Sequence, residues 1–280
     1  MPYGTLYLCA TPIGNLQDIT LRVLDTLKTA DLIACEDTRK TLQLLNHFSI
    51  SKPVTSYYEH NKTVKGDVII QQLKEGKQVA LVSDAGMPGI SDPGYDLIQQ
   101  CLAEGIPFTV LPGAVAAVTG LVLSGLPTDR FTFEGFVPRH KKERLQFFQK
   151  LLQEERTMIF YESPHRLQDT LETMTEVFPE RNMAAARELT KKFEEIVRGT
   201  PSEVLAHFSE HGIRGEFVLL LHGAEPALQE TRDLAWAINR TTQLETEGFS
   251  SKEAMKQAAK EAGLSKRDIY NAMVHTDSPE

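Results

Sequence analysis

The sequence predicts an α/β fold: two α/β domains followed by a small helical C-terminal tail. Between residues 5 and 223, short β-rich runs alternate with amphipathic helical stretches, a pattern typical of largely parallel sheets covered by helices. One longer apolar stretch, 114–126, divides this alternation into two series, and helical patterns alone follow residue 230. We therefore place an N-terminal α/β domain at 1–115, a C-terminal α/β domain at 116–224 and the helical tail at 232–280.

The first series contains five short runs that favour strands. They lie at 5–10, 31–35, 53–58, 78–84 and 108–112. Helices are expected between them at 20–30, 64–75 and 94–104. Leu21, Leu24 and Leu27 lie near helical spacing in the first of these helices. Gly76 and Gly105 directly follow the other two, where glycine favours a helix C-terminus.

The second series repeats the alternation with five further strands. These are expected at 131–136, 157–161, 183–186, 196–200 and 216–221, with helices at 141–154, 165–177 and 202–211. A polar linker is expected at 224–230. In the tail, two helices at 251–262 and 265–274 each begin with Ser, and Gly263 supplies the tight turn between them.

Composition excludes several classes of protein. A net charge of −8 argues against non-specific coating of nucleic acid, which depends on many Lys and Arg, but allows a local basic patch. The three cysteines are widely spaced, no CxxC pair or HExxH motif occurs, and we expect no metal site. No stretch is long and apolar enough for a membrane span or a signal peptide, which favours a cytoplasmic protein.

The most distinctive segment is a loop at 83–94, which contains three glycines and two prolines between a predicted strand and a predicted helix. A simple strand-to-helix turn needs only a few residues, so this length favours a ligand-binding loop. Asp84 and Asp92 lie in the loop, and no basic residue occurs between Lys77 and Arg130. Two carboxylates would repel a polyphosphate but suit ribose hydroxyls, an amino group or a sulfonium cation.

Four further polar segments each follow a predicted strand. They occupy 11–16, 35–39, 161–166 and 186–195. Any one of them could be an ordinary loop that starts a helix, with Asp37 or Ser163 as its N-cap. Four such loops at the same ends of successive strands favour one shared site.

These segments, in this order, resemble the tetrapyrrole-methylase superfamily over essentially the whole chain. The resemblance is carried by Thr-Pro-Ile-Gly-Asn-Leu at 11–16, Cys-Glu-Asp-Thr-Arg at 35–39, the whole loop 83–94, Ser-Gly-Leu-Pro at 124–127, Phe-Glu-Gly-Phe at 133–136, Tyr-Glu-Ser-Pro-His-Arg at 161–166 and Ala-Arg-Glu-Leu-Thr-Lys at 186–191. It implies two α/β domains with a cofactor cleft between them, S-adenosyl-L-methionine as cofactor, and a homodimer. Within the superfamily, the motifs are similar to those of enzymes that methylate the ribose 2′-oxygen of a cytidine in small-subunit (16S) ribosomal RNA.

The resemblance also implies a set of cofactor-binding residues. Pro12 would line the pocket, and Asp84, Ala85, Gly86 and Met87 would contact the cofactor. Its methionine part would be held by Gly113, Ala114, Val115 and Ala116, and its adenosine would lie near Tyr161, Ala186, Gly215 and Glu216. Val115 stands where many members of the family carry Ser, so only backbone contacts are expected at that position.

Two groups of charged residues are candidates for catalysis and for RNA contact. Glu36, Asp37 and Glu188 are candidate bases, and Arg39, Arg187 or Lys191 could stabilise charge or hold a phosphate, although structural salt bridges explain the same residues. The predicted RNA contacts are Arg139, Lys141, Lys142, Arg144, Lys191, Lys192, Lys266 and Arg267. The segment 139–144 is the densest basic run and opens a predicted helix, where cations oppose the helix dipole.

Two other functions remain open from the sequence. One is a porphyrinoid methylase that acts on carbon, but the basic run at 139–144 and the extra tail favour RNA. The other is a non-catalytic RNA-binding or ribosome-assembly factor, which would have no need of the acidic Gly-rich loop.

Overall fold

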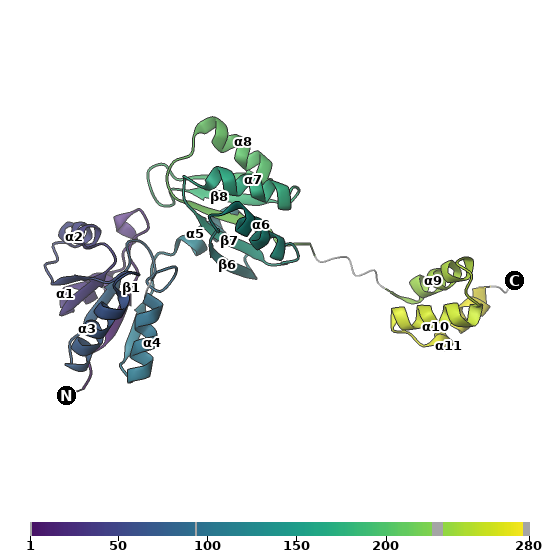
Figure 1. The fold of residues 1–280 in the computed structure, drawn as a ribbon, viewed down its shortest axis with the longest axis horizontal. Helices are drawn as coiled ribbons and strands as arrows, with labels where there is room; N and C mark the ends of the chain where they lie inside the picture. Colours follow the sequence, from purple (N-terminus) through teal and green to yellow (C-terminus); the bar gives the residue numbers. More distant parts are fainter. Residues whose placement is uncertain (1, 93, 226–231, 277–280) are drawn as a thin grey trace. The chain divides into compact units, whose positions relative to one another are not determined.

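A computed structural model describes residues 2–92, 94–225 and 232–276 (Figure 1). The chain divides into two compact units, Met1–Gly223 and Ala224–Glu280, which we call the main unit and the tail unit. The main unit contains both sheets, and the tail unit is helical. The domain boundary expected near residue 115 stays a prediction, and most of the linker expected at 224–230 lies outside the described residues.

The first sheet of the main unit is entirely parallel, with strand order β3-β2-β4-β1-β5. Its strands are β1 (Leu6–Cys9), β2 (Leu32–Cys35), β3 (Val54–Ser56), β4 (Val79–Val82) and β5 (Phe108–Leu111). The connecting helices are η1 (Leu16–Asp18), α1 (Leu21–Thr29), α2 (Thr38–His47), α3 (Lys62–Lys74) and α4 (Gly94–Glu104). Apolar side chains of α3 and α4 cover one face, and those of α1 and α2 cover the other. Burial on both faces explains why the central strands β1, β2 and β4 are nearly continuous apolar runs.

The second sheet has strand order β6-β7-β10-β8-β9, and only the pair β6 and β7 is parallel. The strands are β6 (Phe131–Phe136), β7 (Thr157–Glu162), β8 (Met183–Arg187), β9 (Glu195–Gly199) and β10 (Phe217–Leu221). The expectation of a largely parallel arrangement is therefore wrong for this half. The reason is that β8 and β9 are joined by a loop without a crossover helix, so they can pair only as antiparallel neighbours.

The two faces of the second sheet are covered differently. Three helices, α6 (Lys141–Lys150), α7 (Leu167–Val177) and α8 (Pro201–His211), pack on one face. On the other face lies α5 (Ala116–Ser124), together with Ile13 from the loop after β1 and Leu189 from the loop after β8. Because short loops rather than further helices complete this second layer, the face retains room for a ligand.

Within the described residues of the tail unit, 232–276, there are three helices rather than the two expected. They are α9 (Leu234–Thr246), α10 (Ser251–Ala262) and α11 (Lys266–Thr276), and they share a small core around Ala237, Ala258 and Ile269. Helix α9 escaped prediction because its buried positions include Thr241, which interrupts the apolar pattern. Both helices that were expected are present, with Gly263 in the left-handed conformation between them. None of the helices in the described ranges is long and apolar enough to cross a membrane.

Candidate active site between the two sheets

A cavity of about 520 Å³ lies in the main unit, lined by residues of both halves. The first half contributes the loops after β1, β2 and β4, which are the carboxyl ends of neighbouring parallel strands. The second half contributes the helix-poor face of its sheet and the loops after β7 and β8. Ligands of open α/β sheets bind at such strand ends, and the volume is typical of small-molecule sites.

The Gly-rich loop forms one wall of this cavity and is tied to the end of β1. The backbones of Thr11 and Gly86 exchange hydrogen bonds of 2.9 and 3.1 Å, forming an isolated antiparallel bridge. The Thr11 hydroxyl donates to the Ser83 carbonyl at 3.2 Å, and the Ser83 hydroxyl donates to the Gly86 carbonyl at 3.1 Å. Gly86 has a φ of 82°, a conformation that glycine adopts without strain. The conformation of the loop is therefore fixed by its own hydrogen bonds and by those to the end of β1.

Asp92 fixes the far end of the same loop. Its Oδ1 accepts hydrogen bonds from the backbone amides of Gly89 and Gly94, at 2.7 and 2.8 Å. Partial burial raises the pKa of this carboxyl, against the two amides that lower it. Asp92 thus combines a structural role with a place in the cavity wall.

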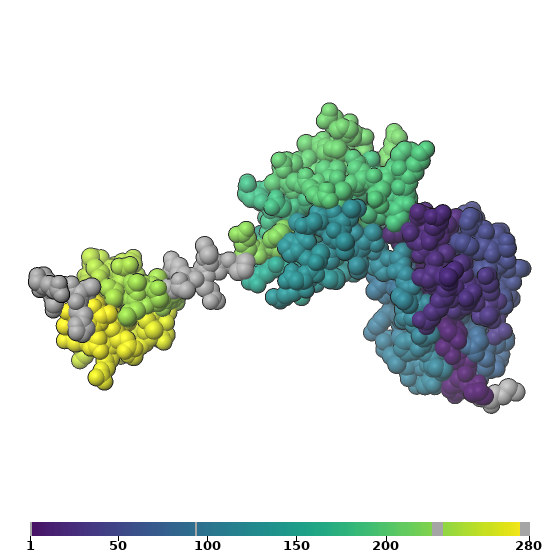
Figure 2. All heavy atoms as spheres, turned by 180° about the vertical axis from the view of Figure 1, so that it is seen from behind, coloured from purple at the N-terminus to yellow at the C-terminus, as the bar shows by residue number. Residues whose placement is uncertain are grey.

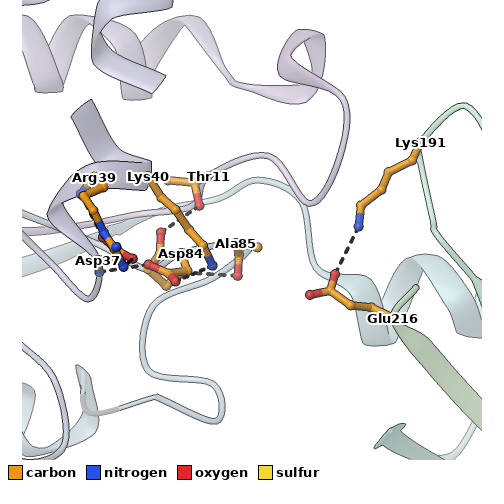
Figure 3. A network of polar contacts seen from close by, with 9 residues as sticks. Thr11, Asp37, Arg39, Lys40, Asp84, Ala85, Lys191 and Glu216 are labelled. Carbon is orange, nitrogen blue, oxygen red and sulfur yellow. Dashed lines mark hydrogen bonds and ion pairs between the residues drawn. The ribbon is translucent and has the colours of Figure 1, made fainter. Parts of the chain in front are cut away.

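Asp84 is the centre of a charged network at the other end of the loop (Figure 3). Its Oδ2 pairs with Lys40 Nζ at 2.7 Å, and its Oδ1 accepts the backbone amide of Asp37 at 3.0 Å. The carboxylate raises the pKa of Lys40. Although the chain around Asp84 is free of basic residues, the fold thus brings Lys40 to it from α2. Lys40 lies 44 residues from Asp84 in the chain, so no local sequence pattern predicts this pair.

The four candidate catalytic residues occupy different surroundings. Glu36 lines the cavity, whereas Asp37 and Arg39 do not line it and form a two-pronged ion pair with each other. The Arg39 guanidinium holds the pKa of Asp37 at about 2. Partial burial raises the pKa of Glu36, and the nearby carboxylates Asp84 and Asp92 raise it further. Much of the Glu36 residue nevertheless remains accessible to solvent.

Glu188 lines the cavity but is engaged by other protein groups. It accepts the backbone amide of Glu216 at 3.1 Å and pairs with Lys191 Nζ at 2.9 Å. Burial opposes its ionisation, but these two donors outweigh burial and lower the pKa of Glu188. Lys191 also reaches Glu216 at 3.2 Å (Figure 3). Glu188 and Thr190 both have positive φ, at 52° and 64°, so the loop holds a strained backbone at the site.

This strained loop contacts the first half of the main unit at Gly14. A Cβ added there would lie 2.5 Å from Lys191 Cγ and 2.8 Å from the Leu189 carbonyl oxygen, so only glycine fits. The amide of Asn15 donates to Thr190 Oγ1 at 3.0 Å. Figure 2 shows the purple N-terminal part of the chain beside the green second half of the main unit.

A buried ion pair supports the loop after β7. Glu162 has a fully buried side chain whose Oε1 pairs with Arg166 Nη2 at 2.6 Å, and its Oε2 accepts from the Thr170 hydroxyl at 2.7 Å. Just before it, the Tyr161 hydroxyl accepts the backbone amide of Ala117 at 3.2 Å. Burial raises the pKa of Tyr161. The pair Glu162–Arg166 thus holds a cavity wall in place.

The structure brings together eight of the thirteen predicted cofactor residues in the cavity wall: Asp84, Ala85, Gly86, Met87, Val115, Ala116, Tyr161 and Glu216. The other five, Pro12, Gly113, Ala114, Ala186 and Gly215, neighbour the wall in the chain without lining it. Residues missed from the sequence include Ile13, Lys40, Phe136 and Val218. Phe136 belongs to the Phe-Glu-Gly-Phe motif at 133–136, but the sequence pattern did not predict that its side chain lines this cavity.

Most of the predicted RNA contacts are accessible, but one is not. Arg139, Lys141, Lys142, Lys192 and Arg267 are exposed, and Lys191 and Lys266 are half-buried. Arg144 is only 3% exposed, and its guanidinium donates to Thr173 Oγ1 at 2.9 Å and to the Arg139 carbonyl at 3.1 Å. The prediction for Arg144 is therefore wrong: this residue ties α6 to α7 and cannot reach a phosphate. No cluster of potential metal ligands occurs among the described residues.

Comparison with known proteins matches a protein family to the main unit of the chain. The family model described as Tetrapyrrole (Corrin/Porphyrin) Methylases matches residues 5–205. This chain belongs to the tetrapyrrole methylase family. As a tetrapyrrole methylase it is a methyltransferase, and the expected fold class of two α/β halves with a helical C-terminal part is confirmed.

Three similar relatives within the family share one name. The chain is 50% identical over 272 residues to "Ribosomal RNA small subunit methyltransferase I" of Halalkalibacterium halodurans, covering 96% of this chain and 94% of the relative. It is 46% identical to the protein of that name from Bacillus subtilis, with the same coverage of 96% and 94%. A Thermotoga maritima protein of that name is 46% identical over 222 residues, which are 79% of this chain and 100% of the relative.

Solved structures of other tetrapyrrole methylases share the fold. A cobalt precorrin-4 methyltransferase superimposes with a TM-score of 0.60 at 17% identity, covering 78% of this chain and 94% of the other. A Thermus thermophilus uroporphyrin-III C-methyl transferase complexed with S-adenyl homocysteine gives a TM-score of 0.56 at 17% identity, covering 78% and 97%. At this identity the likeness concerns the fold alone.

Proposed function

We propose that this chain is an S-adenosylmethionine-dependent methyltransferase that methylates the ribose 2′-oxygen of a cytidine in small-subunit ribosomal RNA. The observation that carries the proposal is the acidic, Gly-rich cavity in the main unit of a chain with relatives, at 46% and 50% identity, that are named small-subunit rRNA methyltransferases. The printed names do not state the nucleotide or the atom, so cytidine and the 2′-oxygen rest on the motifs of the sequence.

The charge and the lining residues of the cavity support S-adenosylmethionine as its ligand. Six carboxylates line it against two lysines, so the field favours a cation over a polyphosphate; they are Glu36, Asp84, Asp92, Glu162, Glu188 and Glu216. The opposite wall is apolar, with Leu189, Phe217 and Val218, and suits an adenine ring. Asp84 and the backbone of the Gly-rich loop would hold the amino-acid and ribose groups, and Tyr161 and Glu216 would lie near the adenosine.

When bound, S-adenosylmethionine supplies an electrophilic methyl group. The chain's contribution is to hold the acceptor hydroxyl in line with that methyl group and to exclude competing water, which can provide most of the acceleration. Of the four candidate catalytic residues, we propose Glu36 as the group that takes the hydroxyl proton. It lines the cavity, its raised pKa favours proton acceptance, and no hydrogen bond or ion pair engages its carboxylate among the described residues. Glu188 is a weaker candidate because Lys191 and the Glu216 amide already engage it.

Two surfaces of the main unit are proposed to hold the RNA backbone. One is the exposed basic start of α6, with Arg139, Lys141 and Lys142. The other is an open groove beside the cavity that contains Lys191, Lys192 and His47. Lys191 lines both the cavity and this groove. If one nucleotide of the RNA enters the cavity, the phosphates on either side of that nucleotide would therefore lie near Lys191 and Lys192.

The tail unit is proposed to dock on RNA and not to take part in the chemistry. Exposed lysines at 252, 256 and 260 recur every four residues on α10, and Lys266 and Arg267 open α11. The Thermotoga relative supports a dispensable tail, because its full length matches 222 residues of this chain, about the size of the main unit.

Homodimer formation and a cytoplasmic location, where small ribosomal subunits occur, are part of the proposal. Val118 and Val122 on α5 are 47% and 70% exposed, and a second copy would cover such apolar side chains. Light scattering of the purified protein tests the dimer: a mass of about twice 31.3 kDa is expected, and a monomeric mass would reject it.

The function is tested with purified protein, tritiated S-adenosylmethionine and three acceptors: unmethylated small ribosomal subunits, naked small-subunit rRNA and a porphyrinoid. Label is expected in the rRNA of the subunits or in the naked rRNA, and calorimetry should show cofactor binding. Label in the porphyrinoid alone would indicate carbon methylation. Absence of both binding and transfer would indicate a scaffold role.

A further inference from the structure

The strand β6 contains an irregularity in the Phe-Glu-Gly-Phe motif, which the proposed function does not yet use. From Phe131 to Phe133 the strand pairs with β7 in regular register, with Phe133 opposite Ile159. The next paired residue is Gly135, opposite Phe160, so Glu134 is an extra residue without a partner in β7. Gly135 has a φ of 71°, as expected for the residue at which a bulge turns the chain.

This bulge decides which face of the sheet carries Phe136. In an unbroken register Phe136 would lie opposite Glu162, on the face that α6, α7 and α8 cover. The inserted residue shifts the pairing, so Phe136 lies opposite Tyr161. A shift of one residue moves every following side chain to the other face. Phe136 is therefore turned away from the helix-covered core and lines the cavity, while Val137 after it is buried in that core.

The ring of Phe136 is unusually exposed for a cavity wall. Its exposed fraction is 56%, and its contact with Tyr161 is edge-to-face, with ring centroids 5.6 Å apart. Phe133 also packs against Tyr161, at 4.9 Å, but it is half-buried and belongs to the apolar cluster. Burial therefore accounts for Phe133 and not for Phe136. The bulge therefore leaves a large apolar ring exposed at the site, where it can contact a ligand.

We propose that Phe136 is the platform on which the base of the acceptor nucleotide stacks. This inference rests on the proposed function, because it assumes a nucleic-acid acceptor. A ribose inside a folded RNA can reach the cavity only when its nucleotide leaves the surrounding stack, which costs the free energy of that stacking. An exposed aromatic face replaces the lost stacking.

The position of Phe136 in the chain favours the acceptor base over the adenine of the cofactor. Only two residues separate it from Arg139, and exposed Lys141 and Lys142 follow at the start of α6. The strand thus leads directly from the ring to the cations proposed to hold the RNA backbone. Phe136 is a positioning residue for the acceptor and has no part in moving the proton.

The test compares four variants at this position and a control. Phe136→Ala and Phe136→Leu remove the ring, whereas Phe136→Tyr and Phe136→Trp keep a planar face. Phe131→Ala is the matched control, since Phe131 is 43% exposed on the same strand but does not line the cavity. Three quantities are measured for each protein: kcat and KM for unmethylated small subunits, affinity for those subunits by filter binding in the presence of S-adenosylhomocysteine, and calorimetric affinity for S-adenosylmethionine.

The ring-free variants are expected to lose roughly 5- to 150-fold in kcat/KM for subunits, the range given by one stacked base. Their affinity for subunits should fall, and their affinity for S-adenosylmethionine should stay within about twofold of the parent. Phe136→Tyr, Phe136→Trp and Phe131→Ala should behave like the parent in every measurement. Retained folding is expected because Phe136 is largely exposed, and the calorimetric titration reports it.

Three results would overturn the assignment while leaving the proposed function intact. One is weaker cofactor binding in Phe136→Ala with unchanged KM for subunits, which would make the ring an adenine platform. Another is parental activity in Phe136→Leu, which would show that apolar surface suffices. The third is parental activity in Phe136→Ala. Failure of the parent itself to methylate rRNA, in subunits or naked, would reject the proposed function and this inference together.

Discussion

Replacing Glu162 with Gln should destabilise the main unit strongly and leave the tail unit unchanged. The substitution keeps the shape of the side chain but leaves the Arg166 guanidinium without its counter-ion at 2.6 Å. Breaking a buried ion pair costs about 3–5 kcal/mol, and the lower end applies because the Arg166 side chain is 22% exposed. We therefore expect a loss of about 3 kcal/mol, or about 6–12 °C in Tm for a unit of this size.

The two units can be followed separately in one sample. The only Trp in the chain, Trp236, lies on α9 and packs against the tail core, so Trp fluorescence reports the tail unit. Far-UV circular dichroism reports mainly the main unit, which contains all ten strands of the described structure. Thermal unfolding of Glu162→Gln should lower the midpoint seen by circular dichroism and not the one seen by fluorescence.

A matched control lies on α7, the helix that Arg166 caps and that contains Thr170. Glu172 is exposed on α7 and accepts a hydrogen bond only from Gln168, one turn away, so Glu172→Gln should change stability by less than about 0.5 kcal/mol. The double variant Glu162→Gln with Arg166→Met should lose less than the sum of the two single variants, because the pair interacts directly. A loss below about 1 kcal/mol in Glu162→Gln would refute the role given to this pair.

Further predictions concern the site and the RNA surfaces. Asp84→Ala should weaken S-adenosylmethionine binding by about 10- to 150-fold, the value of one hydrogen bond to a charged group, and unchanged calorimetric affinity would remove Asp84 from the site. Glu36→Gln should lower kcat and abolish the acid limb of its pH profile, since kcat of the parent should fall as pH drops through the raised pKa of Glu36. The pKa of Glu36 is higher in the folded chain than in the unfolded one, so ionised Glu36 destabilises the folded state at a pH above that pKa. Glu36→Gln should therefore be slightly more stable than the parent at neutral pH, and a less stable variant would contradict the direction of this pKa shift. Lys141→Ala with Lys142→Ala should lower RNA affinity and flatten its salt dependence by about one unit of slope per lost phosphate contact, with Lys150→Ala on the same helix as the control; an equal slope would move the RNA surface to the groove at Lys191 and Lys192. A chain ending at residue 223 should bind the cofactor like the parent but methylate subunits more slowly, and loss of cofactor binding in this folded truncation would give the tail a role in the site.

Much of the secondary structure could be predicted because short runs of apolar residues indicate which segments are buried. The central strands of the first sheet, β1, β2 and β4, are covered on both faces and therefore appear as nearly uninterrupted apolar runs. The approximate positions of all ten strands followed from such runs and from the loops between them. Pairing direction is not local, and the antiparallel β8–β9 pair was accordingly missed.

The site residues that escaped prediction depend on tertiary contacts. Lys40 neutralises Asp84 from a distance of 44 residues in the chain. Arg144 opens a basic helix in sequence but is turned into the interface between α6 and α7. Phe136 faces the cavity only because Glu134 is inserted into its strand, an irregularity that no periodicity in the motif reveals.

The most direct test of the central claim is the chemical identity of the product. Small subunits are methylated with a deuterated methyl donor, and their rRNA is digested to nucleosides and analysed by mass spectrometry. We predict that the label appears in a single nucleoside, 2′-O-methylcytidine, and that Asp84→Ala greatly reduces it. Label on a base carbon or nitrogen, or on the ribose of another nucleoside, would contradict the proposed reaction.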